Sequence, residues 1–225
     1  MSYDRRTRIE QMRKADRVRD RRNRVLAISL SAVVVAGLVT FGTYTLLDRS
    51  SARADQKAAD AKDAKRSAEE QKDLAAGPIE GEKTWDAKKL TRNHVTTPVD
   101  YPMKPPVGGD HSPVWMNCDG EVYKKAIPDV NAVHALEHGS VWVTYTDKAP
   151  AADVDKLAER VSGTPYSLMS PYRDQAGAIM LSAWGKQVTV DGADDRRVAQ
   201  FFAKYVQGPQ TPEPGAACTG GLAAP

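Results

Sequence analysis

The residues Val141-Trp142-Val143-Thr144-Tyr145 and the segment Pro150-Ala151-Ala152-Asp153 that follows them decide the fold class of this chain. Five consecutive β-branched or aromatic residues are typical of a strand. After the proline, apolar residues recur at helical spacing, which predicts an amphipathic helix that ends at Gly163. The apolar face of that helix is formed by Val154, Leu157, Ala158 and Val161. A strand followed by such a helix predicts a domain in which helices pack on a sheet.

The flanking segments continue this alternation of strands and helices. Asp129 and Gly139 are expected to begin and end a short helix. Asp194 or Asp195 is expected to cap the last helix, with Val198, Phe201, Phe202 and Tyr205 on its inner face. The remaining predicted elements are an edge strand over 122–127, a strand over 166–169, and a hairpin over 179–184 and 187–190 that turns at Gly185-Lys186. The order predicts an α+β domain with a mostly antiparallel sheet and helices packed on one face.

The N-terminal part of the chain predicts one membrane-spanning helix. Residues 25–47 contain no charged side chain, and twelve of them are Val, Leu, Ile or Phe. As a helix this run extends about 35 Å, enough for a hydrocarbon core of about 30 Å. The run is longer than the apolar region of a signal peptide, and Asp48 and Arg49 separate it from the small-residue site Ala52-Arg53-Ala54. An uncleaved transmembrane anchor is therefore favoured over a cleaved signal.

Charge on either side of the apolar run predicts its orientation. Residues 1–24 hold ten basic and four acidic side chains, whereas residues 48–74 hold seven of each. The positive-inside rule then places the N-terminus in the cytoplasm and the C-terminal part outside the cell membrane. The basic tail is the topology signal, and no nucleic-acid-binding motif accompanies it.

Four regions follow from this organisation. They are a basic cytoplasmic tail (1–24), a transmembrane helix (25–47), a charged, Ala-rich stalk that is partly helical or disordered (48–77), and an extracytoplasmic globular domain (78–225). The stalk contains Leu74 as its only large aliphatic side chain, so it has no stripe with which to form a coiled coil. Gly77-Pro78 ends any helix there.

The composition excludes several classes of protein. The chain has 225 residues, two cysteines and four histidines, with a mean hydropathy of −0.52. These values exclude a disulfide-dense miniprotein, a large multi-metal protein and a polytopic membrane protein. We predict that Cys118 and Cys218 form a disulfide, because they are the only two cysteines and the domain is expected in an oxidising compartment.

The histidines are the candidate chemical residues. His134 and His138 are four positions apart on the predicted helix, a spacing that suits two imidazoles on one metal ion. His111 lies in a loop rich in Pro and Gly, and we expect it to join them, with Met169 or Glu137 completing the shell. A thioether ligand indicates copper, whereas a carboxylate or water indicates zinc. The alternative is that these histidines are structural.

The segment His134-Ala135-Leu136-Glu137-His138 also matches H-x-x-E-H, the signature of inverted zinc peptidases. Against this reading, the predicted helix ends at once at Gly139, and the domain is small for a peptidase cleft. A binding role is therefore favoured over an enzymatic one.

Five segments carry a resemblance to a known family: Pro105–Trp115, Ala132–Val141, Ser170-Pro171-Tyr172, Ala183-Trp184-Gly185 and Pro212–Cys218. Together they resemble domain of unknown function 3105, a family that is common in actinobacteria and often anchored by one N-terminal helix. The resemblance covers roughly residues 90–220 and implies a membrane-anchored architecture, but it supplies no reaction. Two functions remain open. One is an extracytoplasmic domain that binds copper or zinc, and the other is a non-enzymatic cell-envelope interaction module with an unidentified protein partner.

Overall fold

The computed structural model describes Arg53 and residues 56–224 of the chain. Six strands form one sheet in the spatial order β1-β6-β5-β3-β4-β2. The strands are β1 (Lys83–Thr84), β2 (Asp119–Val122), β3 (Val141–Tyr145), β4 (Ser167–Pro171), β5 (Ile179–Ala183) and β6 (Lys186–Val190). Three helices accompany them, α2 (Asp129–Glu137), α3 (Ala151–Ser162) and α4 (Arg196–Tyr205). A further helix covers residues 56–76. The domain is therefore α+β, as the sequence predicts.

The sheet is mixed, with three antiparallel and two parallel strand pairs, so the expectation of a mostly antiparallel sheet holds only in part. Strand β4 pairs in parallel with both β2 and β3, whereas the β3–β5, β5–β6 and β1–β6 pairs are antiparallel. The reason is the helix α3 between β3 and β4. A helical crossover returns the chain to the end of the sheet from which it left, so the next strand runs in the same direction.

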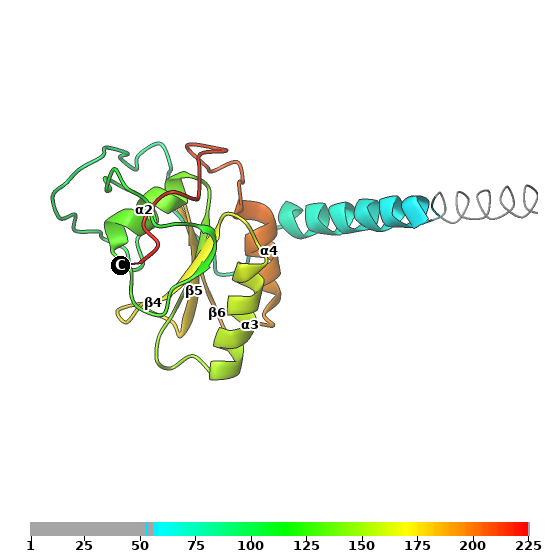
Figure 1. Ribbon diagram of the computed structural model, residues 1–225. Helices are drawn as coiled ribbons and strands as arrows, with labels where there is room; N and C mark the ends of the chain where they lie inside the picture. The colour runs from blue at the N-terminus through cyan, green and yellow to red at the C-terminus, as the bar shows by residue number, and fades with distance from the viewer. Residues whose placement is uncertain (1–52, 54–55, 225) are drawn as a thin grey trace, which may run out of the picture. The chain divides into compact units, whose positions relative to one another are not determined.

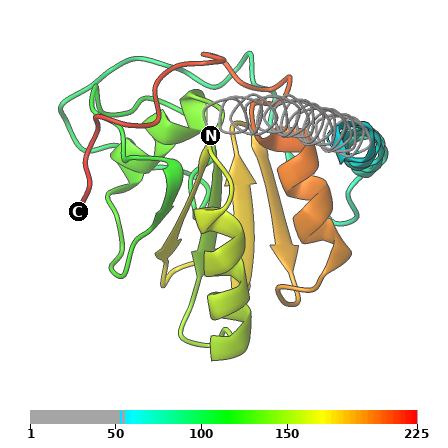
Figure 2. The ribbon, with the colours of Figure 1, turned by 45° about the vertical axis from the view of Figure 1, so that its right-hand side comes forward.

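Helices cover both faces of the sheet, which corrects the expectation that they pack on one face. Helix α2 lies on one side and α3 and α4 lie on the other (Figure 1), and α3 and α4 stand side by side across their face (Figure 2). On β3, Trp142 packs with Leu136 of α2, whereas Val141 and Val143 pack in the cluster that contains Leu157 of α3. Alternate side chains of β3 are thus apolar on both faces, and both faces must be covered.

Several local predictions are confirmed. Gly139 follows α2 with a φ of 91°, the left-handed conformation that glycine adopts most readily. The side chain of Asp195 accepts a hydrogen bond from the backbone N–H of Arg197 and caps α4. Two details differ. Pro128 occupies the N-cap of α2, so Asp129 does not cap it. The predicted edge strand at 122–127 is displaced to Asp119–Val122.

The predicted membrane segment at 25–47 and the basic tail lie outside the described residues. Among the residues that are described, no helix is both long and apolar enough to cross a membrane. Of the predicted stalk, residues 56–76 are helical and most of their side chains are exposed.

The segment that contains Pro105 and Val107 packs against the face of the sheet that α2 covers. It leads to His111 and so determines where that residue lies. The backbone N–H of Gly185 donates to the carbonyl of Val107 over 2.7 Å, and the side chain of Gln187 donates to the carbonyl of Pro105 over 2.9 Å. Gly108 has a φ of 149°, and a β-carbon there would lie 3.2 Å from the Trp184 ring. A side chain at this position would push the segment away from the sheet. The glycine therefore lets the chain that leads to His111 lie close to Trp184.

Candidate metal centre

Four side chains converge on the α2 side of the sheet. His94, His111, His134 and Glu137 each offer one ligand atom, and these atoms all lie within 4.8 Å of one another. His134 and Glu137 come from α2, where a spacing of three residues places both side chains on one face. The other two come from the irregular chain that precedes β2.

The backbone joins the two loop histidines directly. His94 and His111 form an isolated parallel bridge, in which the N–H of Val95 donates to the carbonyl of His111 over 2.7 Å. The N–H of His111 donates to the carbonyl of Asn93 over 3.0 Å. These two hydrogen bonds fix the distance between the histidine backbones, so His94 reaches the cluster although it lies far from α2 in the sequence.

Hydrogen bonds also fix which ring nitrogens are available. The Nδ1 atom of His111 lies 2.8 Å from the carbonyl oxygen of Gly109, and the Nδ1 atom of His134 lies 2.6 Å from that of Ser112. A carbonyl oxygen only accepts, so each Nδ1 carries a proton and donates it. Metal-binding histidines are oriented in this way by backbone carbonyls. Nε2 is therefore the nitrogen that each ring has left to bind an ion.

Three members of the cluster are buried and the fourth is exposed. His111, His134 and Glu137 are at most 4 % exposed, whereas the side chain of His94 is 47 % exposed. The Nε2 atom of His111 lies 2.9 Å from Oε2 of Glu137, and Nε2 of His94 lies 3.8 Å from the same oxygen. Arg92 lies outside them, with its Nη1 atom 3.8 Å from Oε1 of Glu137.

The pKa values respond to this burial and pairing. Burial lowers the pKa of His134 to about 4, and the neighbouring histidines contribute in the same direction. Burial also opposes charge on His111, but the hydrogen bonds to Glu137 and Gly109 outweigh it and raise the pKa of that ring. Burial alone would raise the pKa of Glu137, yet the hydrogen bond and charge of His111 bring it below the usual value. These directions favour a protonated His111 beside an ionised Glu137, and a neutral His134.

The structure brings together two of the four metal ligands predicted from the sequence, His111 and His134. The structure does not bring Met169 to them: it is fully buried on β4, in the core cluster that contains Leu157 of α3 and Phe201 of α4. Its neighbour Leu168 faces the α2 side instead. Successive side chains of a strand point to opposite faces, so Met169 is on the face of the sheet that lies away from the histidines.

His138 lies beside the four-residue group and not in it. Its ring centroid is 4.6 Å from that of His134, but its Nδ1 atom donates to the carbonyl of Ala217 over 2.8 Å. It is the residue that ends α2, and burial lowers its pKa. The peptidase reading of H-x-x-E-H is not supported by this placement, because Glu137 and not His138 shares the cluster with His134.

His94 is the member that the sequence reasoning missed. It lies in an irregular segment with no regular spacing to the other three residues. The sequence predicts Glu137 only as one of two residues that could complete the shell. The available signal for it was its position three residues after His134 on the same helix.

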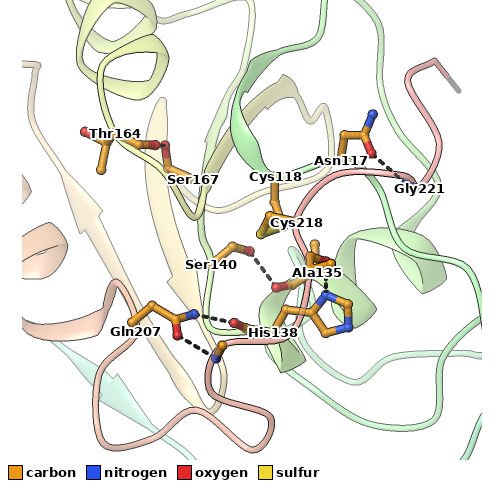
Figure 3. The surroundings of a disulfide bond; sticks show 12 residues. Asn117, Cys118, Ala135, His138, Ser140, Thr164, Ser167, Gln207, Cys218 and Gly221 are labelled. Atoms are coloured by element: carbon orange, nitrogen blue, oxygen red, sulfur yellow. Dashed lines mark hydrogen bonds between the residues drawn. A yellow bond between two sulfur atoms is a disulfide. The ribbon is translucent and has the colours of Figure 1, made fainter.

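A disulfide ties the C-terminal segment to the residue before β2, and hydrogen bonds hold the end of α2 nearby (Figure 3). Cys118 and Cys218 are bonded, with their Cα atoms 4.7 Å apart. The N–H of Cys118 donates to the carbonyl of Cys218 over 2.8 Å, and the side chain of Gln207 donates to the carbonyl of His138. The disulfide therefore anchors the residue next to Ala217, whose carbonyl orients the His138 ring.

Comparison with known proteins identifies the family. Residues 94–220, more than half of the chain, match the model of a family described as protein of unknown function, DUF3105. The match begins at His94 and includes all four clustered residues and both cysteines. No curated protein and no solved structure matches the chain. The match over most of the folded domain shows that the chain belongs to the DUF3105 family.

Proposed function

We propose that this domain binds one divalent transition-metal ion through His94, His111, His134 and Glu137. The observation that carries the proposal is the convergence of three imidazoles and one carboxylate within 4.8 Å. The Nδ1–H groups of His111 and His134 are already committed to backbone carbonyls, which is how proteins orient histidines for metal binding. Neither feature is needed to fill a hydrophobic core.

The donor set favours zinc. Three nitrogens and one carboxylate oxygen suit Zn²⁺, which prefers four ligands in a tetrahedron. The thioether that would favour copper(I) is not available from Met169, which lies on the other face of the sheet. Copper(II) also accepts imidazole and carboxylate ligands and binds most such sites more tightly than zinc. It is therefore the competing ion that an experiment must include.

Small movements bring the donors to zinc-binding distance. Ligand atoms of tetrahedral zinc lie about 3.4 Å apart, so the widest separation in the cluster closes by about 1.4 Å on binding. His94 is the exposed member and is the side chain with the most freedom to move. The ion replaces the direct hydrogen bond between His111 and Glu137, because both atoms of that bond become ligands.

We also propose that the domain is held outside the cytoplasm by a single membrane-spanning helix at residues 25–47. The support is the uncharged 23-residue run and the excess of basic residues before it. A disulfide between Cys118 and Cys218 suits an oxidising extracytoplasmic compartment. The helix over 56–76 is polar enough to serve as the spacer between membrane and domain.

One observation favours the alternative, an envelope interaction module whose histidines are structural. The 2.9 Å hydrogen bond between His111 and Glu137 already satisfies both buried groups without an ion. A protein that used the cluster only for stability would need nothing further.

Metal loading separates the two functions. The full-length chain is purified in detergent, stripped with a chelator, exposed to zinc or copper(II), desalted and analysed for metal by mass spectrometry. We expect about one ion per chain, and a loss of most loading in His134→Ala and Glu137→Gln. Met169→Leu is the matched control, since it conserves volume and removes only the thioether. Loading below about a tenth of an ion per chain, or unchanged loading in His134→Ala, leaves the interaction module as the function.

A further inference from the structure

We propose that Asp110 is a positioning residue of the metal centre, because its carboxylate holds the segment that carries His94 and so makes His94 a ligand. This inference rests on the proposed metal site and explains how the one exposed ligand of that site is kept at the ion. Asp110 is not one of the four clustered residues. It acts through Asn93, the residue that precedes His94 in the chain.

His94 depends on such support more than the other three ligands do. Its side chain is 47 % exposed, whereas those of His111, His134 and Glu137 are at most 4 % exposed. Residues 91–94 are all exposed and belong to no helix and to none of the six strands. An exposed side chain on an irregular segment loses conformational freedom when it binds an ion. Holding its backbone in place before the ion arrives lowers that cost.

The carboxylate of Asp110 provides this hold. Its Oδ1 atom accepts one hydrogen bond from the backbone N–H of Asn93 over 3.2 Å and another from Nδ2 of Asn93 over 2.9 Å. Two backbone hydrogen bonds, those between His111 and the residues Asn93 and Val95, make the other connection between the same segments. Two of these four hydrogen bonds therefore end on a single carboxylate oxygen. Hydrogen bonds to an ionised acceptor are also stronger than those between neutral groups.

Asp110 is itself fixed to the buried part of the domain. The hydroxyl of Tyr101 donates a hydrogen bond to the backbone carbonyl of Asp110 over 2.6 Å, and Tyr101 is only 8 % exposed. The next residue in the chain, His111, is fully buried. The carboxylate thus extends from a rigid part of the chain toward an exposed one, which is the arrangement that a positioning residue requires.

The other ligands do not need this clip. His111 is buried and its ring is held by the carbonyl of Gly109, and His134 and Glu137 lie on α2. Without the Asp110 carboxylate we expect the ion to keep these three ligands and to take water in the place of His94. Zinc sites with three protein ligands and one water are common. Asp110 therefore decides between a site with four protein ligands and a site that is open to solvent.

Cobalt(II) provides the test, because its d–d absorption depends on the ligands and zinc has none. The full-length chain in detergent is stripped of metal and titrated with Co²⁺. We expect Asp110→Ala to bind cobalt about tenfold more weakly than wild type. Its bound-cobalt spectrum should match that of His94→Ala and differ from that of wild type. Asp110→Asn keeps an oxygen that accepts from Asn93, and should restore the wild-type spectrum and most of the affinity. Asp100→Ala is the matched control, since it removes an exposed carboxylate from the same irregular stretch, and it should behave as wild type does.

A double variant tests whether Asp110 acts through His94. In the His94→Ala chain, the further change Asp110→Ala should leave cobalt affinity unchanged, because the ligand that it positions is already absent. A further loss of about tenfold there would overturn the proposed route through His94. A residue that served only the fold would instead lower the urea midpoint of the metal-free chain and leave the cobalt spectrum of wild type intact, and this outcome overturns the proposal.

The outcomes also separate this inference from the metal site. Equal cobalt affinity and equal spectra in wild type and Asp110→Ala retain the metal site and overturn the role of Asp110. A wild-type chain that takes up no cobalt overturns both proposals. Should Asp110→Ala fail to fold, Asn93→Ala replaces it, since it removes only the 2.9 Å hydrogen bond at an exposed position. The same direction of spectral change is expected there, and an unchanged spectrum overturns the proposal.

Discussion

The Nε2 atom of His111 lies 2.9 Å from the Oε2 atom of Glu137, across 26 residues of sequence and in a part of the domain where both side chains are almost fully buried. Buried charges are tolerated only when they are paired and hydrogen-bonded. Nδ1 of His111 is held by the Gly109 carbonyl, so the ring cannot turn away from the carboxylate without losing that bond. The pair is therefore a fixed feature of the metal-free domain and also the first place where an ion would act.

Removing one partner of this pair should be costly to the metal-free protein. We expect Glu137→Ala to lower the free energy of unfolding by about 3 kcal/mol or more, because it leaves a buried imidazole without its carboxylate. The measurement is urea unfolding of the chelator-treated chain, followed by tryptophan fluorescence. Asp194→Ala is the control, since Asp194 is 82 % exposed and pairs with exposed Lys156, and it should cost less than about 1 kcal/mol.

The same pair can be tested for coupling. If it acts as a unit, the His111→Ala/Glu137→Ala double variant loses less stability than the sum of the two single variants. Additive losses would show that the two side chains contribute independently and would remove the argument for a fixed pair.

Acid should weaken the metal-free domain through His134. Its pKa is about 4 in the folded chain and near 6.5 when unfolded, so the unfolded chain binds a proton first as the pH falls. The contribution of a neutral His134 to the free energy of unfolding is thus fully present above pH 6.5. It is lost as the pH falls toward 4, which lowers the free energy of unfolding by up to about 3 kcal/mol. We expect the urea midpoint to fall between pH 7 and pH 4.5, and to fall less in His134→Gln. Identical pH profiles for the two proteins would contradict this.

Zinc binding should release a proton from His111. The pKa of this ring is raised in the metal-free chain, so it keeps its proton to a higher pH than a free histidine, and a metal ligand must be neutral. Apparent zinc affinity is therefore expected to rise as the pH increases through that raised pKa. Calorimetric titrations in buffers of different ionisation enthalpy measure the released proton. Heats that do not depend on the buffer would contradict the displacement of the His111 proton.

Loss of the disulfide should destabilise the domain more than it affects the cluster. The Cys118–Cys218 bond closes a loop with a sequence separation of 100, which is worth up to about 4–5 kcal/mol in the chain-entropy model. We expect the double variant Cys118→Ser/Cys218→Ser to unfold at a lower urea concentration than wild type. It should still load zinc while folded, because none of the four clustered residues is held in place by Ala217 or Cys218. Thiol titration of the denatured, unreduced wild type should find no free thiol. Two titratable thiols would contradict the bond.

The membrane topology is tested separately from the site. A reporter that is active only outside the cytoplasm, fused after Pro225, should be active, and a cytoplasmic reporter at the same point should be silent. The reverse pattern would place the domain in the cytoplasm and remove the compartment argument for the disulfide.

Predictions that depended on neighbouring residues succeeded. The five-residue run Val141–Tyr145 is a strand, Asp195 caps α4, and Gly139 takes the left-handed conformation that ends α2. Each of these features is decided within one or two turns of chain, where propensity and capping act. The order of the strands in the sheet was less accessible, although the helix between β3 and β4 is a signal for parallel pairing that the sequence contains.

The candidate metal centre likewise has a part that local sequence determines and a part that it does not. The sequence by itself places His134 and Glu137 on one face of a helix, because three residues make almost one helical turn. It also determines that Leu168 and Met169 point to opposite faces of a strand. Which of those faces receives the histidines depends on how the strand pairs and which helix covers it, so only the tertiary structure shows that Met169 lies on the other face. Only the tertiary structure brought in His94, since two backbone hydrogen bonds between distant, irregular segments hold it beside His111 and no local periodicity records them.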